Sequence, residues 1–497
     1  MPRALSTSTL AGVVGLLAFV ELTSGVLQGY YTPMLTDIAR HLGVHDADVN
    51  WLEGSQLMLS ALVVPALAKL GDMVGHRRIL LWSTAVTAAA SLVLPFTDSF
   101  AVFLVAWALQ GFYVVWLPLE IALVWSRSRA MGSPAGLTAK AAGVLVASLE
   151  VGAIAGALAG GALVDALPLR TVLLVPALMV VACFVVILLG VEESPAPVGG
   201  RLDTVGLVLI SLALLSLTGG LSLLRLEGVA AVAPWALVAL GVALLWPFVR
   251  WELRHDDPLV DVRMFRSPAL GPVFVTAGLF GVSVLGAQAP LSTFARTDPA
   301  VHGYGLGTSG FQTSLLIGVY LVGMIVGALG FPRVARLATP RLTLVGASAA
   351  VAVGFFLFLP FHATYGQVVV NMVVVGIGSG ALVAALPSAA AAAAPPTQTG
   401  VATGLTNSVK TVGGAIASCV FGLALAGSAL SGAAAEGTAG AFGGYVTVWV
   451  VCGGAALVAA ALLLVVPKDA FTDRREHAAP GVPGPHEPAP APATPAA

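Results

Sequence analysis

Fourteen apolar runs, each long enough to cross a lipid bilayer, constrain this sequence more than any other feature. Crossing the hydrocarbon core takes about 20 residues of helix. Backbone polar groups inside lipid must be satisfied within the segment, which favours helices, and the runs lack the polar–apolar alternation of barrel strands. The sequence therefore predicts an all-α integral membrane protein. The runs occupy residues 10–31, 51–70, 79–96, 101–124, 140–163, 171–190, 204–224, 231–249, 269–292, 309–331, 342–360, 368–390, 401–426 and 443–466.

The composition excludes two soluble classes of protein. Of the 497 residues, 58% are apolar and 9% are charged, and the net charge is −1. An ordinary soluble protein has about 25% charged residues, so a soluble enzyme of this length is excluded. A nucleic-acid-binding protein would need a basic face, which this charge does not supply. We expect the lipid bilayer as a partner and no nucleic acid.

The basic residues are divided unevenly between the two sets of loops. One set, together with both tails, holds 18 of the 23 lysines and arginines, the opposite set holds 4, and Lys410 lies inside a run. Basic loops stay in the cytoplasm, so both termini are expected there, in a multi-pass protein of the plasma membrane. Glu21 and the length of the first run indicate a retained span rather than a cleaved signal. The abundance of alanine, glycine and proline is typical of a bacterial source with a GC-rich genome.

The spacing of the runs divides the chain into four parts. Residues 1–190 and 269–466 each hold six runs, and residues 191–268 hold two runs with longer polar connections on either side. Residues 467–497 are rich in proline and alanine, which predicts a disordered cytoplasmic tail.

A short charged turn follows the second run. Asp72 can accept hydrogen bonds from a helix N-terminus or an arginine, and Gly75 permits a tight turn. Arg77 and Arg78 complete the turn. The simpler interpretation is that the arginines only hold this loop in the cytoplasm.

A glycine stripe marks the fifth run. Gly152, Gly156 and Gly160 recur every four residues, and Gly161 follows directly. This spacing places the first three on one helix face, where another helix can approach closely. Ordinary packing of small residues is the alternative interpretation.

These motifs resemble those of the major facilitator superfamily. The turn around Asp72 is similar to its GxxxDxxGRR-like signature loop, and the glycine stripe is similar to its antiporter motif GxxxGPxxGG. Leu109-Gln110-Gly111, with Pro118, resembles its LxxRxxQG motif. The segments that begin at Asp203 and at Asp257 resemble those flanking the two extra helices of the fourteen-span drug:proton antiporter branch.

The resemblance implies a fold, an activity and roles for the motif residues. The fold would be two six-helix bundles plus two extra central helices. The activity would be secondary active export of an amphipathic small molecule, in exchange for protons, by alternating access, by a monomer with no cofactor beyond the proton gradient. The turn from Asp72 to Arg78 would form a cytoplasmic gate, and Gly152, Gly156, Gly160 and Gly161 would lie between the bundles.

Several motif positions depart from the family pattern. Ala68 and Met73 replace a glycine and a base in the turn, and Ala157 replaces the proline of the antiporter motif. Trp107 stands where the family has an arginine that is linked to proton transfer. A facilitator, or a transporter of an endogenous metabolite without proton coupling, is therefore the alternative function.

Glu21 is the leading candidate for proton or cation coupling. It lies near the middle of the first run, where a charge costs at least about 2.5–3.5 kcal/mol, so it should face a cavity or carry a proton. Ser24, Gln28 and Tyr31 extend one polar stripe from it at helical spacing. The alternative is a neutral structural glutamic acid inside a bundle.

Three further glutamates lie in or near the runs. Glu150 in the fifth run and Glu120 toward the cytoplasmic end of the fourth are the other coupling candidates, although Glu120 could simply sit at the interface. Glu53 is expected at the membrane interface.

The fourth run predicts part of a substrate cavity. Phe103, Trp107, Gln110, Tyr113 and Glu120 recur at helical spacing, and an aromatic face with an amide and an acid suits an amphipathic organic molecule. Aromatic packing is the alternative. The predicted cavity residues are Gln28, Tyr31, Trp107, Gln110, Tyr113, Gln288, Asn371 and Asn407.

Lys410 is the only basic residue deep inside a run. It either pairs with an acid or lies at the cytoplasmic edge. Gln312 and Tyr320 are further polar candidates in the second bundle.

Other chemistries have little support in the sequence. All eight histidines lie in loops or the tail, so neither a metal site nor a histidine proton relay in the membrane is expected. The chain contains no GxxxxGK[ST] loop for a nucleotide. An integral-membrane enzyme would need larger loops with acid–base residues, and a channel would need repeated filter motifs.

Overall fold

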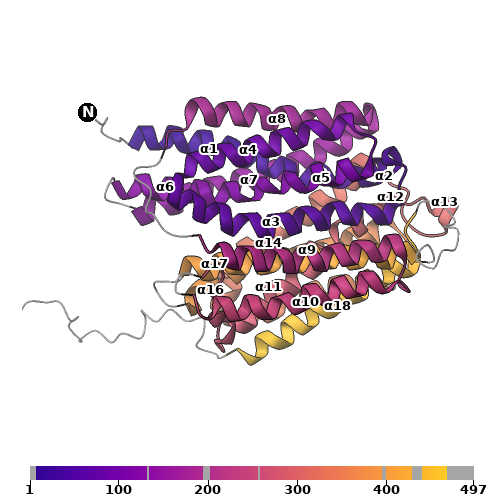
Figure 1. Cartoon of the computed structure of the whole chain (residues 1–497). Helices are drawn as coiled ribbons and strands as arrows, with labels where there is room; N and C mark the ends of the chain where they lie inside the picture. The colour runs from indigo at the N-terminus through magenta and orange to yellow at the C-terminus, as the bar shows by residue number, and fades with distance from the viewer. Residues whose placement is uncertain are drawn as a thin grey trace, which may run out of the picture.

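The computed structural model describes residues 7–130, 134–193, 202–255, 258–394, 399–427 and 439–466, so the tail predicted for residues 467–497 lies outside the described residues. Long helices run side by side across the molecule (Figure 1). The described residues contain 14 segments long and apolar enough to cross a membrane, which confirms the predicted all-α membrane fold.

The first half of the molecule has its own apolar core, built around side chains such as Phe103, Trp116 and Val180. Its helices are α1 (Thr7–Gly29), α2 (Leu35–Leu42), α3 (Val49–Val74), α4 (His76–Val93), α5 (Phe100–Gln110), α6 (Trp116–Ala130), α7 (Pro134–Ala166) and α8 (Leu169–Gly190), with the 3-10 helices η1 (Thr32–Met34), η2 (Asp46–Asp48), η3 (Leu94–Phe96) and η4 (Gly111–Val115).

The second half forms a separate core, which includes Phe274, Phe355 and Trp449. Its helices are α11 (Gly271–Val284), α12 (Gln288–Arg296), α13 (Pro299–His302), α14 (Gly310–Leu337), α15 (Pro340–Leu357), α16 (Tyr365–Ala393), α17 (Thr399–Ala426) and α18 (Phe442–Val465), preceded by the 3-10 helix η5 (Val262–Arg266).

Two further helices, α9 (Thr204–Glu227) and α10 (Val232–Glu252), pack against each other between the halves in sequence. In space, α9 covers the seam where α3 of the first half meets α17 of the second. Leu224 of α9 packs there against Trp51 of α3 and Cys419 of α17. The extra pair is therefore attached at the junction of the halves.

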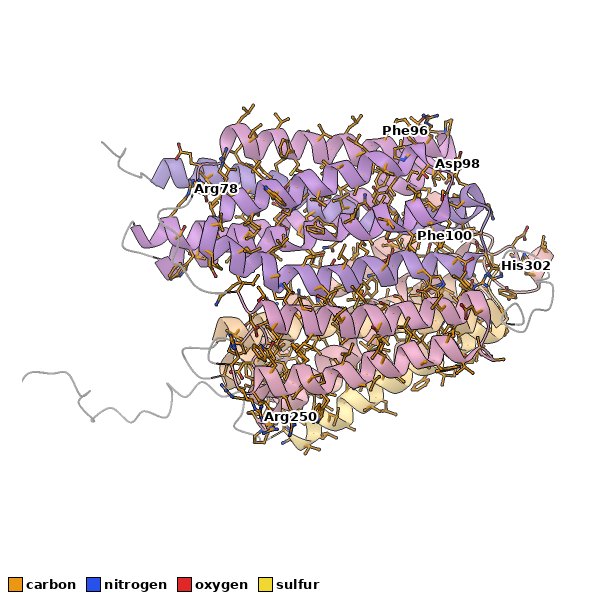
Figure 2. The ribbon with its side chains drawn as sticks, in the orientation of Figure 1. Arg78, Phe96, Asp98, Phe100, Arg250 and His302 are labelled. Atoms are coloured by element: carbon orange, nitrogen blue, oxygen red, sulfur yellow. The ribbon has the colours of Figure 1, made fainter. Side chains whose placement is uncertain are left out.

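The two ends of the molecule differ in charge. We call the end where α1 begins and α18 finishes the terminal end, and the opposite one the far end (Figure 1). Arg78 and Arg250 lie at the terminal end, whereas Asp98 and His302 lie at the far end (Figure 2). The helix order thus places the arginine-rich connections together, as the sequence predicts.

Two of the predicted runs are broken rather than continuous, and the first is followed by a further short helix. The first run ends at Gly29 and the chain continues through η1 into α2, because Pro33 cannot donate the backbone hydrogen bond that a continuing helix needs. The fourth run is interrupted by η4, and the ninth divides into α11 and α12. Both α2 and α12 lie at the far end, where they contact each other.

Candidate functional site

Two glutamates meet inside the first half. Glu21 of α1 and Glu120 of α6 are completely buried, and their carboxyl groups lie near enough to interact with each other. None of the four oxygens has a hydrogen-bond partner at bonding distance among the described residues. Two neighbouring carboxylates in apolar surroundings cannot both stay ionised, so this pair retains at least one proton. The arrangement can therefore take up and release a proton.

A third acid lies close to this pair. Glu53 of α3 is only 9% exposed, and it faces Tyr113 of η4, which also faces Glu21. Glu53 is thus buried within the protein, and its place at the membrane interface stays a prediction.

The aromatic face predicted to line a cavity is instead packed inside the first half. Gln110 Nε2 donates hydrogen bonds to Tyr31 Oη (3.0 Å) and Ser91 Oγ (2.8 Å). The rings of Tyr31 and Trp107 lie 4.8 Å apart, and Tyr113 is also buried. The Gln110 amide nitrogen is thus paired within the cluster, whereas Gln110 Oε1 and Trp107 Nε1 are buried without a hydrogen-bond partner among the described residues. In this conformation aromatic packing, the alternative interpretation, describes them.

The other predicted cavity residues divide into two groups. Gln28 and Asn407 are exposed and Gln288 is half-buried, so all three side chains remain accessible. Asn371 is buried, and its Nδ2 donates to the carbonyl of Phe361 (2.7 Å). Asn371 thus fixes the loop before α16 and does not line a cavity.

The charged turn is tied to α8 of the same half. Glu193 accepts from the backbone N–H groups of Arg77 (3.0 Å) and Arg78 (3.2 Å), at the start of α4. Asp72 instead pairs with His76, at 3.1 Å. The acid at this helix N-terminus is therefore Glu193, which differs from the expectation for Asp72. Gly75 has a φ of 120°, and an added Cβ would lie 2.7 Å from the Glu193 carboxyl group, so the turn requires glycine.

The glycine stripe differs from its predicted place between the bundles. A Cβ added to Gly152 would lie 2.2 Å from the carbonyl oxygen of Leu22, and one added to Gly160 would lie 2.1 Å from that of Tyr30. Gly156 likewise faces α1. These three glycines let α1 and α7 pack closely within the first half. The spacing of the glycines predicts a close helix contact, but it does not specify which helix is the partner. Gly161 alone of the four faces the second half, where it meets Gly310 of α14.

Polar contacts join the two halves at the far end. The guanidinium of Arg296 on α12 bonds to both carboxylate oxygens of Asp37 on α2, each at 2.7 Å. Asp165 of α7 accepts from the backbone N–H groups of Gly310 and Phe311, at 2.8 Å each. None of Arg296, Asp37 and Asp165 was predicted as part of a site from the sequence. Arg296 was nevertheless conspicuous as one of only four basic residues in the far-end loops.

Two glycines toward the terminal end of α7 and α17 have open space beside them. A Cβ added to Gly143 of α7 or to Gly404 of α17 would meet nothing within 4 Å. Between this open region and the far-end contacts, Glu150 of α7 and Lys410 of α17 lie near enough for their charges to attract. The Coulombic attraction thus joins residues from different halves.

An apolar groove of about 390 Å³ is lined by residues of both halves. Ile154 and Leu158 of α7 line one side, and Leu315, Val322 and other residues of α14 and α16 line the rest. Val322 is more than half exposed, so the groove opens on the outer surface of the helices, where lipid would lie.

Comparison with known proteins agrees with this architecture. The family model "Major Facilitator Superfamily" matches residues 17–418. The cephamycin export protein CmcT of Amycolatopsis lactamdurans is 30% identical over 417 residues, which cover 82% of each chain. The drug efflux pump JefA of Mycobacterium tuberculosis is 26% identical over 410 residues, 79% of this chain and 75% of its own.

Solved structures show the same fold. The nucleoside transporter NupG superposes with a TM-score of 0.62 at 14% identity, covering 93% of this chain and 99% of its own. The similar proteins are membrane transporters, and the chain itself is a multi-pass membrane protein. The family match, the fourteen spans and the two packed halves together establish that this chain belongs to the major facilitator superfamily.

Proposed function

We propose that this transporter exports an amphipathic small molecule across the plasma membrane, in exchange for protons, by alternating access. Relatives named for the export of cephamycin and of drugs support the direction and the type of substrate. The single observation that carries proton exchange is the contact between Glu21 and Glu120, since a buried carboxyl pair is a site where one proton can be held and released.

The arrangement of the halves supports a place in the transport cycle. With both termini in the cytoplasm, as the basic residues favour, the far-end contacts close the outer side of the molecule. This is the state that would accept substrate from the cell and release a proton to it. Alternating access then requires the bond between Arg296 and Asp37 to break as the far end opens.

A facilitator without proton coupling is the second candidate, and Trp107 favours it. The ring of Trp107 is buried against Tyr31, at the position where the family pattern has an arginine. No group of three or more metal-ligating side chains occurs among the described residues, and neither an enzyme nor a metal cofactor is proposed. We propose a monomer that binds no nucleic acid.

Transport by the purified protein in proteoliposomes tests proton coupling. With an imposed pH gradient, the wild type should concentrate a lipophilic cation or a neutral amphipathic compound, and without the gradient it should only equilibrate it. Glu21→Gln and Glu120→Gln should each abolish the gradient-driven component and leave some downhill exchange. Glu227→Gln, a change at an exposed glutamate at the far end of α9, is the matched control.

The two outcomes separate the candidates. Concentration that survives intact in both Glu21→Gln and Glu120→Gln would show that the proton travels elsewhere. Equilibration by the wild type that ignores the gradient would identify a facilitator.

A further inference from the structure

The extra helix pair is attached to both halves of the molecule, by a different contact at each end. At the far end, Arg225 of α9 donates to Asp48 of η2, in the first half (3.0 Å). At the terminal end, Glu252 of α10 accepts from the backbone N–H of Val260 (3.2 Å), whose side chain packs against the core of the second half. We propose that Asp203 and Glu252 share one proton, and that this proton links the extra pair to the second half.

Asp203 is the first of the two acids at this end of the pair. It caps α9, because its Oδ1 accepts from the backbone N–H of Gly206 (2.8 Å). The indole N–H of Trp251, on α10, points at both carboxylate oxygens, 2.9 Å from Oδ1 and 3.1 Å from Oδ2. Asp203 is only 5% exposed. It therefore joins the start of α9 to the end of α10, and its Oδ2 can still accept a further hydrogen bond.

The second acid, Glu252, has a buried oxygen without a partner. The residue is 1% exposed. Its Oε2 accepts from Val260, but its Oε1 has no hydrogen-bond partner among the described residues. A buried polar atom normally has such a partner, so a donor is missing at this oxygen.

The unpartnered oxygen lies beside the Asp203 carboxyl group. A Cβ added to Gly206 would lie 2.4 Å from Glu252 Oε1 and 2.5 Å from Asp203 Oδ2. The two oxygens thus border the same point, and their separation cannot exceed the sum of these distances. A proton shared by the two acids supplies the missing donor, since one carboxyl group then carries an O–H that donates to the other.

Two other charged or titratable groups follow Glu252 at the end of α10. Arg254 is exposed. His255 stacks on the indole of Trp251, with the ring centroids 5.4 Å apart. The ion pairs between described residues include neither Glu252 nor Asp203. Neither group at the end of α10 therefore neutralises the acids by direct contact.

Two more charged groups lie on the connection that leads into η5. Asp261 accepts from the backbone N–H of Arg263 (3.1 Å), and its charge also acts on Glu252. The guanidinium of Arg263 donates to the carbonyl of Leu253 (2.8 Å) rather than to an acid. This connection thus adds a third negative charge near the two buried acids, and its arginine is held by a backbone oxygen.

The proton decides whether the two acids attract or repel each other. Two ionised carboxylates this close repel, and burial strengthens the repulsion. With one proton between them they form a charge-assisted O–H···O hydrogen bond. Loss of the proton to water as the pH rises should therefore drive Glu252 away from Asp203 and release the N–H of Val260. The extra pair would then keep its attachment to the first half through Arg225 and lose the attachment to the second half at the terminal end.

Hydrogen–deuterium exchange of the full chain tests this inference. We would measure the peptide that contains Val260 by mass spectrometry, in nanodiscs of neutral lipid, at about pH 6 and about pH 9. Exchange times are scaled to the intrinsic chemical rate at each pH. In the wild type, protection of this peptide should fall by about tenfold or more at the higher pH. Residues 212–224, in the body of α9, are the internal reference and should not change.

An amide reproduces the shape of a protonated carboxyl group without its response to pH. Glu252→Gln and Asp203→Asn should therefore each keep the protection seen at the lower pH and lose less than about twofold at the higher one. Glu227→Gln, at an exposed glutamate at the opposite end of α9, is the matched control and should retain the full response. His255→Gln should also retain it, because the imidazole does not join the two acids.

Three results would overturn the inference: protection in the wild type that is equal at the two pH values, a full response in both Glu252→Gln and Asp203→Asn, or loss of the response in His255→Gln. None of them measures transport, so the proposed proton exchange is judged separately by the Glu21 and Glu120 variants.

Discussion

The helix pairs α1–α7 and α11–α17 share one construction but carry opposite charges. In the first pair, Gly152 and Gly160 bring α7 onto the carbonyls of α1. In the second, an added Cβ at Gly281 of α11 would lie 1.9 Å from the carbonyl oxygen of Lys410, and one at Gly413 of α17 would lie 2.2 Å from that of Gly278. The two halves therefore use the same close backbone contact.

The charges on these pairs differ completely. Glu21 and Glu150 belong to the first pair and Lys410 belongs to the second, and the apolar runs of residues 269–466 contain no acid. Both helix pairs have the close glycine contact, which indicates that the fold requires it. The charged residues differ between the pairs, which indicates that they serve a separate role in each half. Under the proposed mechanism, proton binding would belong to the first half, and the second half would supply the opposing cation.

The largest effect should follow from filling the shared contact. Gly160→Leu and Gly281→Leu should each lower the yield of monodisperse protein by about tenfold or more, since a side chain cannot occupy the space of a carbonyl oxygen. Size-exclusion chromatography of detergent extracts measures this. Gly143→Leu and Gly404→Leu, on α7 and α17 where space is open, are the paired controls. Normal yields for Gly281→Leu would show that the second pair tolerates looser packing.

The division of charge can be tested by combining substitutions. If Glu21 and Glu120 share one proton, Glu21→Gln and Glu120→Gln should each reduce pH-driven transport by about tenfold or more, and the double variant should be no worse than either single one. Initial rates in proteoliposomes give the comparison. If the fold reduction in the double variant equals the product of the two single reductions, Glu21 and Glu120 are two independent proton sites.

Opening of the far end should be visible through a native thiol. Cys419 of α17 is 2% exposed, at the seam with α3. Arg296→Ala removes the partner of Asp37 in the second half and leaves only Arg40 of the same helix, 3.7 Å away. This should favour the opened state and speed labelling of Cys419 by an impermeant maleimide about tenfold. Cys183 and Cys452, buried inside the separate halves, should not respond. An unchanged rate would place the closure of the far end in other contacts.

The smallest effect concerns the helix caps of the far-end loops. In the first half His45 Nδ1 accepts from the N–H of Ala47 (3.1 Å), and in the second half Asp298 accepts from Ala300 (2.9 Å). Burial holds the pKa of His45 below its usual value of 6.5, so the unfolded chain takes up this proton first as the pH falls. The free energy of unfolding should therefore decrease by up to about 1 kcal/mol below about pH 6.5.

Thermal unfolding at about pH 7.5 and about pH 5.5 measures this loss. His45→Asn keeps a cap and should show a smaller difference in Tm between the two values, while Asp298→Asn is the control in the second half. Equal differences for all three proteins would assign the pH response to other groups.

Much of the fold could be predicted because the bilayer imposes it locally. Each of the fourteen spans is a contiguous apolar run, and Glu21 was identifiable as a charge inside one of them. The breaks inside the fourth and ninth runs were missed, because the helices on either side of each break belong to one continuous apolar run. An apolar run predicts that a segment lies in the membrane, but it does not predict whether the helix within that segment is continuous.

The site was less predictable because it depends on contacts between distant residues. The pair of Arg296 with Asp37 joins residues 259 positions apart, and nothing in the spacing of the glycine stripe specifies α1 as its partner. The aromatic residues of the fourth run have the composition of a binding surface, but Tyr31 and Ser91, from other segments of the first half, accept hydrogen bonds from Gln110 Nε2. Periodicity identifies a shared face, not what that face contacts.

The position of α9 makes the molecule unequal in the plane of the bilayer. One of the two long seams between the halves, at α3 and α17, is shielded by α9, through contacts such as that of Leu214 with Met58 and Ala415. The other seam, at α7 and α14, borders the apolar groove and stays in reach of acyl chains. Among the described residues, α9 therefore blocks the approach of a lipophilic compound from the membrane to the seam at α3 and α17. The seam at α7 and α14 remains accessible from the lipid.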